Sequence, residues 1–191
     1  MNLKGSQKQA EPSRNHEIKE IKAELSEENV VVRPAEKFGS LTSRGYGTVQ
    51  DKKLVLNVYE ALFLKSKGLL EVFNGKPRKP LDFQELLHRF GDKDENVWVK
   101  YLIYRDLRSR GYVVRDGFGL GIDFRVYERG EYSNATATYL ILGLQEGKPI
   151  SIQVLVSILK HVQSLKKKMV LAVVNRRGEI VYYTLSKLTM R

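Results

Sequence analysis

The sequence contains no cysteine and only three histidines, His16, His88 and His161. Disulfides and thiolate metal sites are therefore excluded, and imidazoles so few and so far apart do not favour a zinc cluster. Metal chemistry would have to rest on carboxylates. We expect no metal and no other cofactor.

The sequence also lacks long apolar runs. None approaches the roughly 20 residues that a membrane-spanning helix needs. Residues 1–17 are polar and have no apolar core of the kind found in secretory signals. We therefore expect a soluble, cytoplasmic protein without a membrane partner. Its 191 residues, 42% of them hydrophobic, can build one medium-sized core or two small ones.

Basic residues outnumber acidic ones. The chain has 33 Lys and Arg against 22 Asp and Glu, which gives a formal net charge of +11. Such an excess favours a polyanionic partner such as nucleic acid. A lysine-rich surface with no such partner explains the charge equally well, so charge alone leaves both interpretations open.

Composition divides the chain into a tail and two units. Residues 1–29 hold few large apolar side chains, so we expect a mobile tail in which residues 18–25 could form a short helix. Residues 30–91 predict a small mixed unit, and a Gly-Asp-Lys-Asp run ends it. Residues 96–191 form the second unit.

The first unit predicts alternating strands and helices. Asp82 and Glu85 have the spacing of a capping box, which marks the start of a helix. The other predicted elements are a strand at 30–32, an amphipathic helix between 53 and 67, and a strand at 69–73.

The second unit has the layout of an α/β nuclease. A helix begins near Val97 and ends before Gly111, and a wholly apolar, buried strand is predicted at 169–174. Between and after these we expect strands at 112–114, 121–127 and 138–142, a helix over 152–165 that Ser151 caps, and a last strand at 180–184. The predicted class is α/β (α+β), with a restriction-endonuclease-like second domain.

Two chemistries use this layout. A magnesium-dependent nuclease needs converging carboxylates, commonly an Asp on one strand and a Glu-x-Lys on the next. Asp123 could be the first ligand, but residues 138–142 contain neither Glu nor Lys. The other chemistry uses the ribose 2′-hydroxyl of RNA as nucleophile, and it needs only an acid, a base and a cation near the phosphate.

Four ordered runs of the second unit resemble the catalytic domain of archaeal tRNA-intron endonucleases. They are residues 101–112 (YLIYRDLRSRGY), 121–127 (GIDFRVY), 139–141 (YLI) and 164–174 (SLKKKMVLAVV). The resemblance extends from about Val97 to the C-terminus, and the first unit matches only in general layout.

The family uses a Tyr, a His and a Lys as general base, general acid and transition-state stabiliser. The resemblance places the Tyr at Tyr127 and the Lys at Lys167. Each residue also has an ordinary structural explanation. A tyrosine suits a strand end, and a lysine suits the C-terminal end of a helix dipole.

The family histidine falls on Thr136, three residues before Tyr139. Neighbouring Asn134, Ala135 and Ala137 supply no imidazole either. A threonine hydroxyl cannot donate a proton at neutral pH as an imidazolium does, and losing a general acid typically costs ~10²- to 10⁴-fold in rate. We therefore expect this chain to be inactive alone.

The resemblance also bears on RNA and subunit contacts. Lys160 falls where some members use an Arg to hold an unpaired base, and Lys166 and Lys168 flank the family lysine. We take these three lysines as candidates for RNA contact. Family subunits pair through an acidic loop after the buried strand, which here consists of Asn175, Arg176, Arg177, Gly178 and Glu179.

The resemblance therefore implies a structural subunit of a heterotetrameric tRNA-splicing endonuclease. Its partners would be a histidine-bearing catalytic subunit and pre-tRNA, cut at bulge-helix-bulge sites without metal to a cyclic phosphate and a 5′-hydroxyl. The alternatives are a basic RNA-binding module without a nuclease partner and a magnesium-dependent nuclease built on Asp123.

Overall fold

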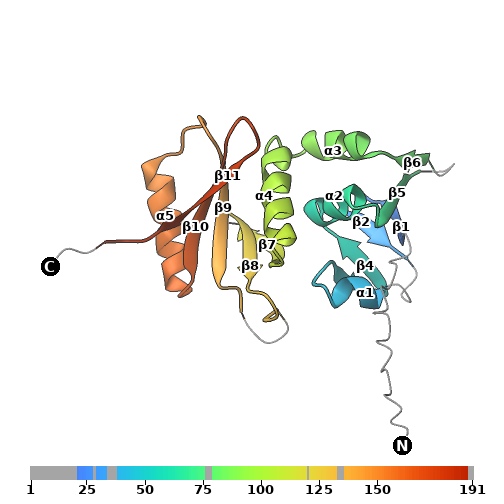
Figure 1. The fold of residues 1–191 in the computed structure, drawn as a ribbon, viewed down its shortest axis with the longest axis horizontal. Coiled ribbons are helices and arrows are strands. Elements are labelled where there is room, and N and C mark those ends of the chain that lie inside the picture. Colours follow the sequence, from blue (N-terminus) through green and yellow to red (C-terminus); the bar gives the residue numbers. More distant parts are fainter. Residues whose placement is uncertain are drawn as a thin grey trace, which may run out of the picture.

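The computed structural model describes residues 21–27, 29–33, 38–75, 79–119, 121–132 and 136–188. Within these residues the chain forms two sheets, and helix α4 (Val97–Ser109) runs between them (Figure 1). Strands before α4 build the first sheet, and strands after it build the second. The prediction of an α/β fold with a mixed first unit and an α/β second unit is confirmed.

The first sheet has the strand order β3-β4-β2-β1-β5-β6. Its strands are β1 (Ile21–Leu25), β2 (Val30–Val32), β3 (Thr48–Gln50), β4 (Lys53–Leu56), β5 (Leu70–Asn74) and β6 (Lys79–Leu81). Its helices are α1 (Phe38–Thr42), α2 (Val58–Ser66) and α3 (Phe83–Gly91).

The expected tail over residues 1–29 is wrong for Ile21–Leu25. These residues form β1, which pairs antiparallel with β2 and parallel with β5. Ile21 and Ala23 are buried on one face, the alternation that a half-buried strand shows. A strand with partners on both sides depends on distant residues, so composition alone predicts neither it nor the sheet. The part of the tail at 1–20 lies outside the described residues.

The helix predicted between 53 and 67 begins later than expected. Residues Lys53–Leu56 form β4, because Asp51 and Lys52 both have positive φ and turn the chain back onto β3 as a tight hairpin. Helix α2 then starts after Asn57, whose side chain accepts a hydrogen bond from the Glu60 N–H at 2.8 Å. The Glu60 carboxylate in turn accepts from the Asn57 N–H, which completes a capping box.

Other local predictions are confirmed. Asp82 and Glu85 form the expected capping box of α3, and Gly111 follows α4 with a φ of +90°. Helix α5 spans Ile152–Ser164 with Ser151 at its N-cap position. The Ser151 hydroxyl contacts the Gln153 side chain instead of a backbone N–H, so the expected side-chain cap is absent.

The second sheet has the order β11-β10-β9-β8-β7 and lies between α4 and α5 (Figure 1). Its strands are β7 (Val113–Gly119), β8 (Ile122–Tyr127), β9 (Tyr139–Gln145), β10 (Lys168–Val174) and β11 (Ile180–Leu185). Strands β9 and β10 are parallel and α5 connects them. Alternate β9 residues face opposite helices: Ile141 belongs to the core under α4, and Leu140 to the core under α5.

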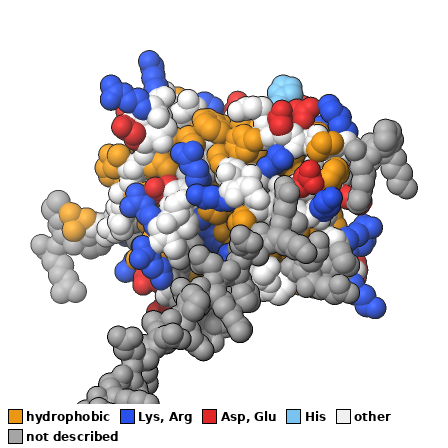
Figure 2. Space-filling model, turned by 45° about the vertical axis from the view of Figure 1, so that its right-hand side comes forward, with side chains coloured by type: hydrophobic (Ala, Val, Ile, Leu, Met, Phe, Trp, Pro, Cys, Tyr) orange, Lys and Arg blue, Asp and Glu red, His pale blue; other side chains and the backbone are white. Residues whose placement is uncertain are grey.

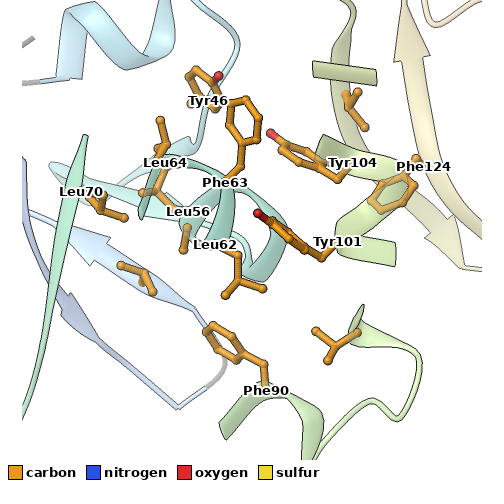
Figure 3. Close-up of a cluster of buried hydrophobic side chains, with 14 of the residues drawn as sticks. Tyr46, Leu56, Leu62, Phe63, Leu64, Leu70, Phe90, Tyr101, Tyr104 and Phe124 are labelled. Atoms are coloured by element: carbon orange, nitrogen blue, oxygen red, sulfur yellow. The ribbon is translucent and has the colours of Figure 1, made fainter. Parts of the chain in front are cut away.

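Aromatic side chains join the two units. Phe63 of α2 packs edge-on against Tyr104 of α4 with ring centroids 5.9 Å apart, and Tyr104 contacts Phe124 of β8 at 6.0 Å (Figure 3). Tyr59 of α2 also contacts Phe124, edge-on, with ring centroids 5.2 Å apart. These rings belong to one cluster of buried side chains that includes residues of both units, so the two units pack around one continuous core. None of the helices in the described part of the chain is both long and apolar enough to cross a membrane.

Candidate functional site

The end of α5 positions Lys167. The Lys167 N–H donates to the Val162 carbonyl at 3.2 Å, and the Lys166 N–H donates to the Gln163 carbonyl at 2.9 Å. This pair of bonds is a Schellman motif, with Lys166 at the left-handed position at φ 55°. The motif reverses the chain directly after the helix and directs Lys167 away from the α5 axis, just before β10 begins.

Thr136 and Lys167, far apart in the sequence, meet in space. The Lys167 ammonium donates a hydrogen bond to the Thr136 hydroxyl at 2.5 Å. Backbone bonds at Thr138 fix this approach, since its N–H donates to the Val126 carbonyl and its carbonyl accepts from the Lys168 N–H. The structure therefore brings Thr136 and Lys167, to which the resemblance assigns the family histidine and lysine positions, into direct contact.

Tyr127 lies at the end of β8, next to the carbonyl that holds Thr138. Its ring is half-buried and meets Tyr132 edge-on, with centroids 5.0 Å apart and an interplanar angle of 89°. The sequence analysis did not select Tyr132 as a candidate. The sequence feature that could have identified it is an aromatic residue within the polar loop after β8. Tyr127 thus offers a phenol beside Tyr132, and the separate pair of Thr136 and Lys167 offers a hydroxyl and an ammonium, with no imidazole at position 136. Asn134 and Ala135 lie outside the described residues.

The remaining candidate lysines lie near the same end of α5. Lys160 is exposed on the helix, and Lys166 is exposed in the Schellman turn. Lys168 opens β10 with its ammonium 5.6 Å from the centre of the Tyr139 ring. Three consecutive cations at one helix end form a local positive surface that is suited to a phosphate backbone.

The loop after β10 is a compact hairpin. Asn175 organises it: its carboxamide oxygen accepts from the N–H groups of Arg177 and Glu179, and its amide nitrogen donates to the Glu179 carboxylate at 2.6 Å. The acidic side chain of the loop is thus engaged within the loop itself. Arg176 and Arg177 are exposed and outnumber Glu179, so the hairpin carries a net positive charge.

Asp123 is held in an ion-pair network. One carboxylate oxygen lies 3.1 Å from the Lys100 ammonium, and the other accepts from the Gly143 N–H at 2.7 Å. Lys100 also pairs with Asp94 at 2.9 Å. Among the described residues, no group of three or more His, Cys, Asp or Glu is placed to hold a metal ion. Asp123 therefore has a structural role that links α4 to β8 and β9.

An ion pair between Glu60 and Arg115 joins the two units. No sequence pattern indicated this pair. Glu60 of α2 is only 1% exposed, and its carboxylate accepts from Arg115 of β7 at 3.0 Å. It also accepts from the N–H groups of Gly47 and Asn57. Burial raises the pKa of Glu60 to about 7, and the Arg115 charge and the backbone donors offset part of that rise.

Comparison with known proteins identifies the family of both units. Residues 97–182 match the family described as tRNA intron endonuclease, catalytic C-terminal domain, and residues 21–87 match its N-terminal domain. Both units of the chain therefore match domains of one tRNA endonuclease family.

Individual relatives extend the match over most of the chain. The tRNA-splicing endonuclease of Methanococcus maripaludis is 33% identical over 90% of this chain and 97% of its own length. That of Methanococcus vannielii is 34% identical over the same shares, and that of Pyrococcus furiosus is 37% identical over 74% of this chain and 80% of its own. The chain belongs to the tRNA-splicing endonuclease family.

Proposed function

We propose that this chain is the structural subunit of a heteromeric tRNA-splicing endonuclease. The complex acts in the cytoplasm on pre-tRNA at bulge-helix-bulge intron sites, without metal, and leaves a cyclic phosphate and a 5′-hydroxyl. One observation carries the proposal: Thr136 contacts Lys167 at 2.5 Å, in the place where the resemblance puts the general acid.

The chemistry at this place explains the assignment. A 2′-hydroxyl attack on the phosphate needs a proton donor for the departing 5′-oxygen. Histidine titrates near neutral pH and serves this role, whereas a threonine hydroxyl does not. Lys167 and Tyr127 remain at the family positions, but an active site without its acid gains little from its other members. Both residues are vestigial under this proposal.

An exposed apolar surface supports assembly with a second subunit. Strand β11 is an edge strand, and its Val181 and Tyr183 are 50% and 54% exposed. On α5, Ile152 and Val156 are exposed as well. An unpaired edge strand beside exposed apolar side chains is suited to pairing with another chain. The occupant we propose is the homologous, histidine-bearing subunit, because the resemblance implies that family subunits pair with one another.

The cationic hairpin favours a particular role in that pairing. Arg176 and Arg177 give it a positive surface, so it does not match the family's acidic loop, which inserts into a basic pocket. We propose that this chain receives the acidic loop of its partner and that its own hairpin makes a different contact.

We also propose that the first unit of the chain begins at Ile21 rather than Val30, and that residues 96–191 form the second unit.

The first prediction concerns the isolated chain. We expect the purified chain to leave pre-tRNA intact, because no acid is available at Thr136, and to cleave it once a histidine-bearing partner is added. Cleavage is followed on labelled pre-tRNA with and without a chelator, and copurified proteins are identified by mass analysis. Efficient, chelator-insensitive cleavage by the chain alone would contradict the structural role.

The second prediction concerns salt. Basic side chains are spread over the face seen in Figure 2 with acidic ones among them, so strong RNA contact depends on local clusters such as Lys166 to Lys168. We expect log affinity for RNA to fall linearly with log salt, with a slope of about −0.7 to −0.9 for each neutralised phosphate. Filter binding across a salt series measures it, and a flat response would exclude RNA contact by this subunit.

A second candidate function is a basic RNA-binding module without a nuclease partner, which the net charge of +11 favours. The copurification experiment separates the two, since this candidate yields RNA binding without a homologous subunit. The magnesium nuclease is less favoured, because both oxygens of Asp123 already bond to Lys100 and Gly143.

A further inference from the structure

A cavity of about 360 Å³ opens where the two units meet. Its wall is formed by three segments, which are the turn after α1, the connection from α4 to β7 and the loop after β8. Its charged and aromatic lining consists of Arg44, Arg108, Tyr112 and Tyr132, and Gly111 and Gly130 lie between them. Among the described residues that line it, none is acidic.

Close contacts between the units hold the cavity open. The Arg108 guanidinium donates to the Arg44 carbonyl at 2.8 Å and to the Tyr112 carbonyl at 3.1 Å, and it stacks 3.9 Å from the centre of the Tyr46 ring. Gly45 packs so closely that a Cβ there would lie 2.6 Å from the Val113 side chain. The side of the cavity formed by the turn after α1 and by the end of α4 is therefore fixed by the junction between the units.

The cavity combines aromatic rings with guanidinium groups. Tyr132 is the ring that meets Tyr127 edge-on, so the cavity lies beside the family tyrosine. Tyr112 has the Arg129 guanidinium 5.8 Å from its ring centre. Arg44 is exposed at the rim. Rings on which a base can stack, next to cations that attract phosphate, form the usual recognition surface for an unpaired nucleotide.

We propose that this cavity binds one unpaired nucleotide of the RNA, with its base against Tyr132 or Tyr112 and its phosphate near Arg44. The inference rests on the proposed function, because it assumes that the chain contacts RNA. It adds a site that spans both units and lies apart from the lysines at the end of α5. Under this proposal the region around Tyr127 no longer catalyses cleavage but positions the RNA for the active site of the partner.

The test measures affinity of the full-length chain for an RNA hairpin with an unpaired bulge and for the same hairpin fully paired. We expect Tyr132→Leu to weaken binding of the bulged hairpin by about 5- to 100-fold, the range that base stacking contributes. Arg44→Ala should weaken it as well, because it removes the cation that faces the phosphate. Binding of the paired hairpin should change much less. Tyr132→Phe keeps the ring and is the matched control, and Arg89→Ala removes the same charge from α3. Photocross-linking from a thiouridine in the bulge should reach Tyr112 or Tyr132.

The outcomes separate this inference from the proposed function. If the wild-type chain binds RNA with the expected salt dependence but Tyr132→Leu and Arg44→Ala bind as the wild type does, the cavity is not a nucleotide site and the proposed function stands. A wild-type chain without affinity for either hairpin overturns the nucleotide site and RNA contact by this subunit, whereas chelator-insensitive cleavage by the chain alone overturns the proposed function. Should Tyr132→Leu fail to fold, as judged by circular dichroism, the exposed Arg44→Ala decides alone.

Discussion

Lys167→Ala in this chain should change single-turnover cleavage by the assembled complex by less than about twofold, because groups that act together lose their value once one is missing. The same substitution at the matching lysine of the histidine-bearing subunit should lower the rate by roughly 10²- to 10⁴-fold, since charge stabilisation and acid catalysis there operate together. The measurement is single-turnover cleavage of pre-tRNA by complexes that carry one altered subunit at a time.

Assembly has to be verified for each variant. Lys167→Ala also removes the hydrogen bond to Thr136, so size-exclusion chromatography must show that the complex still forms. Tyr127→Phe is the second variant, because it removes the phenol and keeps the ring against Tyr132. If Lys167→Ala here slows cleavage as much as the partner's substitution does, this chain takes part in catalysis and the structural assignment is wrong.

Glu60→Ala should lower the free energy of unfolding by about 3–5 kcal/mol, the usual cost of leaving one partner of a buried ion pair without the other. The substitution removes the carboxylate that pairs with Arg115, which keeps only neutral acceptors, and it removes the acceptor for the N–H groups of Gly47 and Asn57. Glu60→Gln keeps the volume and one amide oxygen, so we expect a smaller loss. Urea unfolding monitored by circular dichroism measures both, and a loss below about 1 kcal/mol for Glu60→Ala would show that the contact is unimportant.

The same group makes stability depend on pH with a definite sign. The folded-state pKa of Glu60 is raised from 4.5 to about 7, so the folded protein binds a proton that the unfolded chain has already released between these values. Stability from this group is therefore greatest below pH 4.5 and decreases as pH rises towards 7. Comparing Glu60→Gln with the wild type at both ends of this range isolates the contribution, because glutamine does not titrate.

Local signals in the sequence were sufficient where neighbouring residues decide the structure. The Asp82 and Glu85 capping box, the helix over Val97–Ser109 and the apolar strand at Lys168–Val174 each follow from spacing within a few residues. The resemblance carried by residues 97 onward pointed to the family, and the comparisons confirm it. For the second unit, then, local patterns and the resemblance together predicted fold and family.

Elements that depend on distant partners were harder to predict. Apolar spacing over residues 53–67 fits a helix, but the turn at Asp51 and Lys52 makes its first part a strand. Ile21–Leu25 alternates apolar and polar residues over only five positions in a largely polar stretch, and it becomes a strand because β2 and β5 flank it. Strand pairing is a property of two segments, whereas helix formation is largely a property of one.

The sequence by itself determined the family, the excess of positive charge and the absence of an imidazole at position 136. Only the tertiary structure decided that Thr136 lies against Lys167, that Glu60 pairs with Arg115 across the units, and that Tyr112 and Tyr132 line one cavity with Arg44. The physical reason is separation along the chain: the first pair is 31 positions apart in the sequence, and the second is 55 positions apart. Such contacts form only after sheet pairing and core packing have brought the segments together, and no local pattern encodes them.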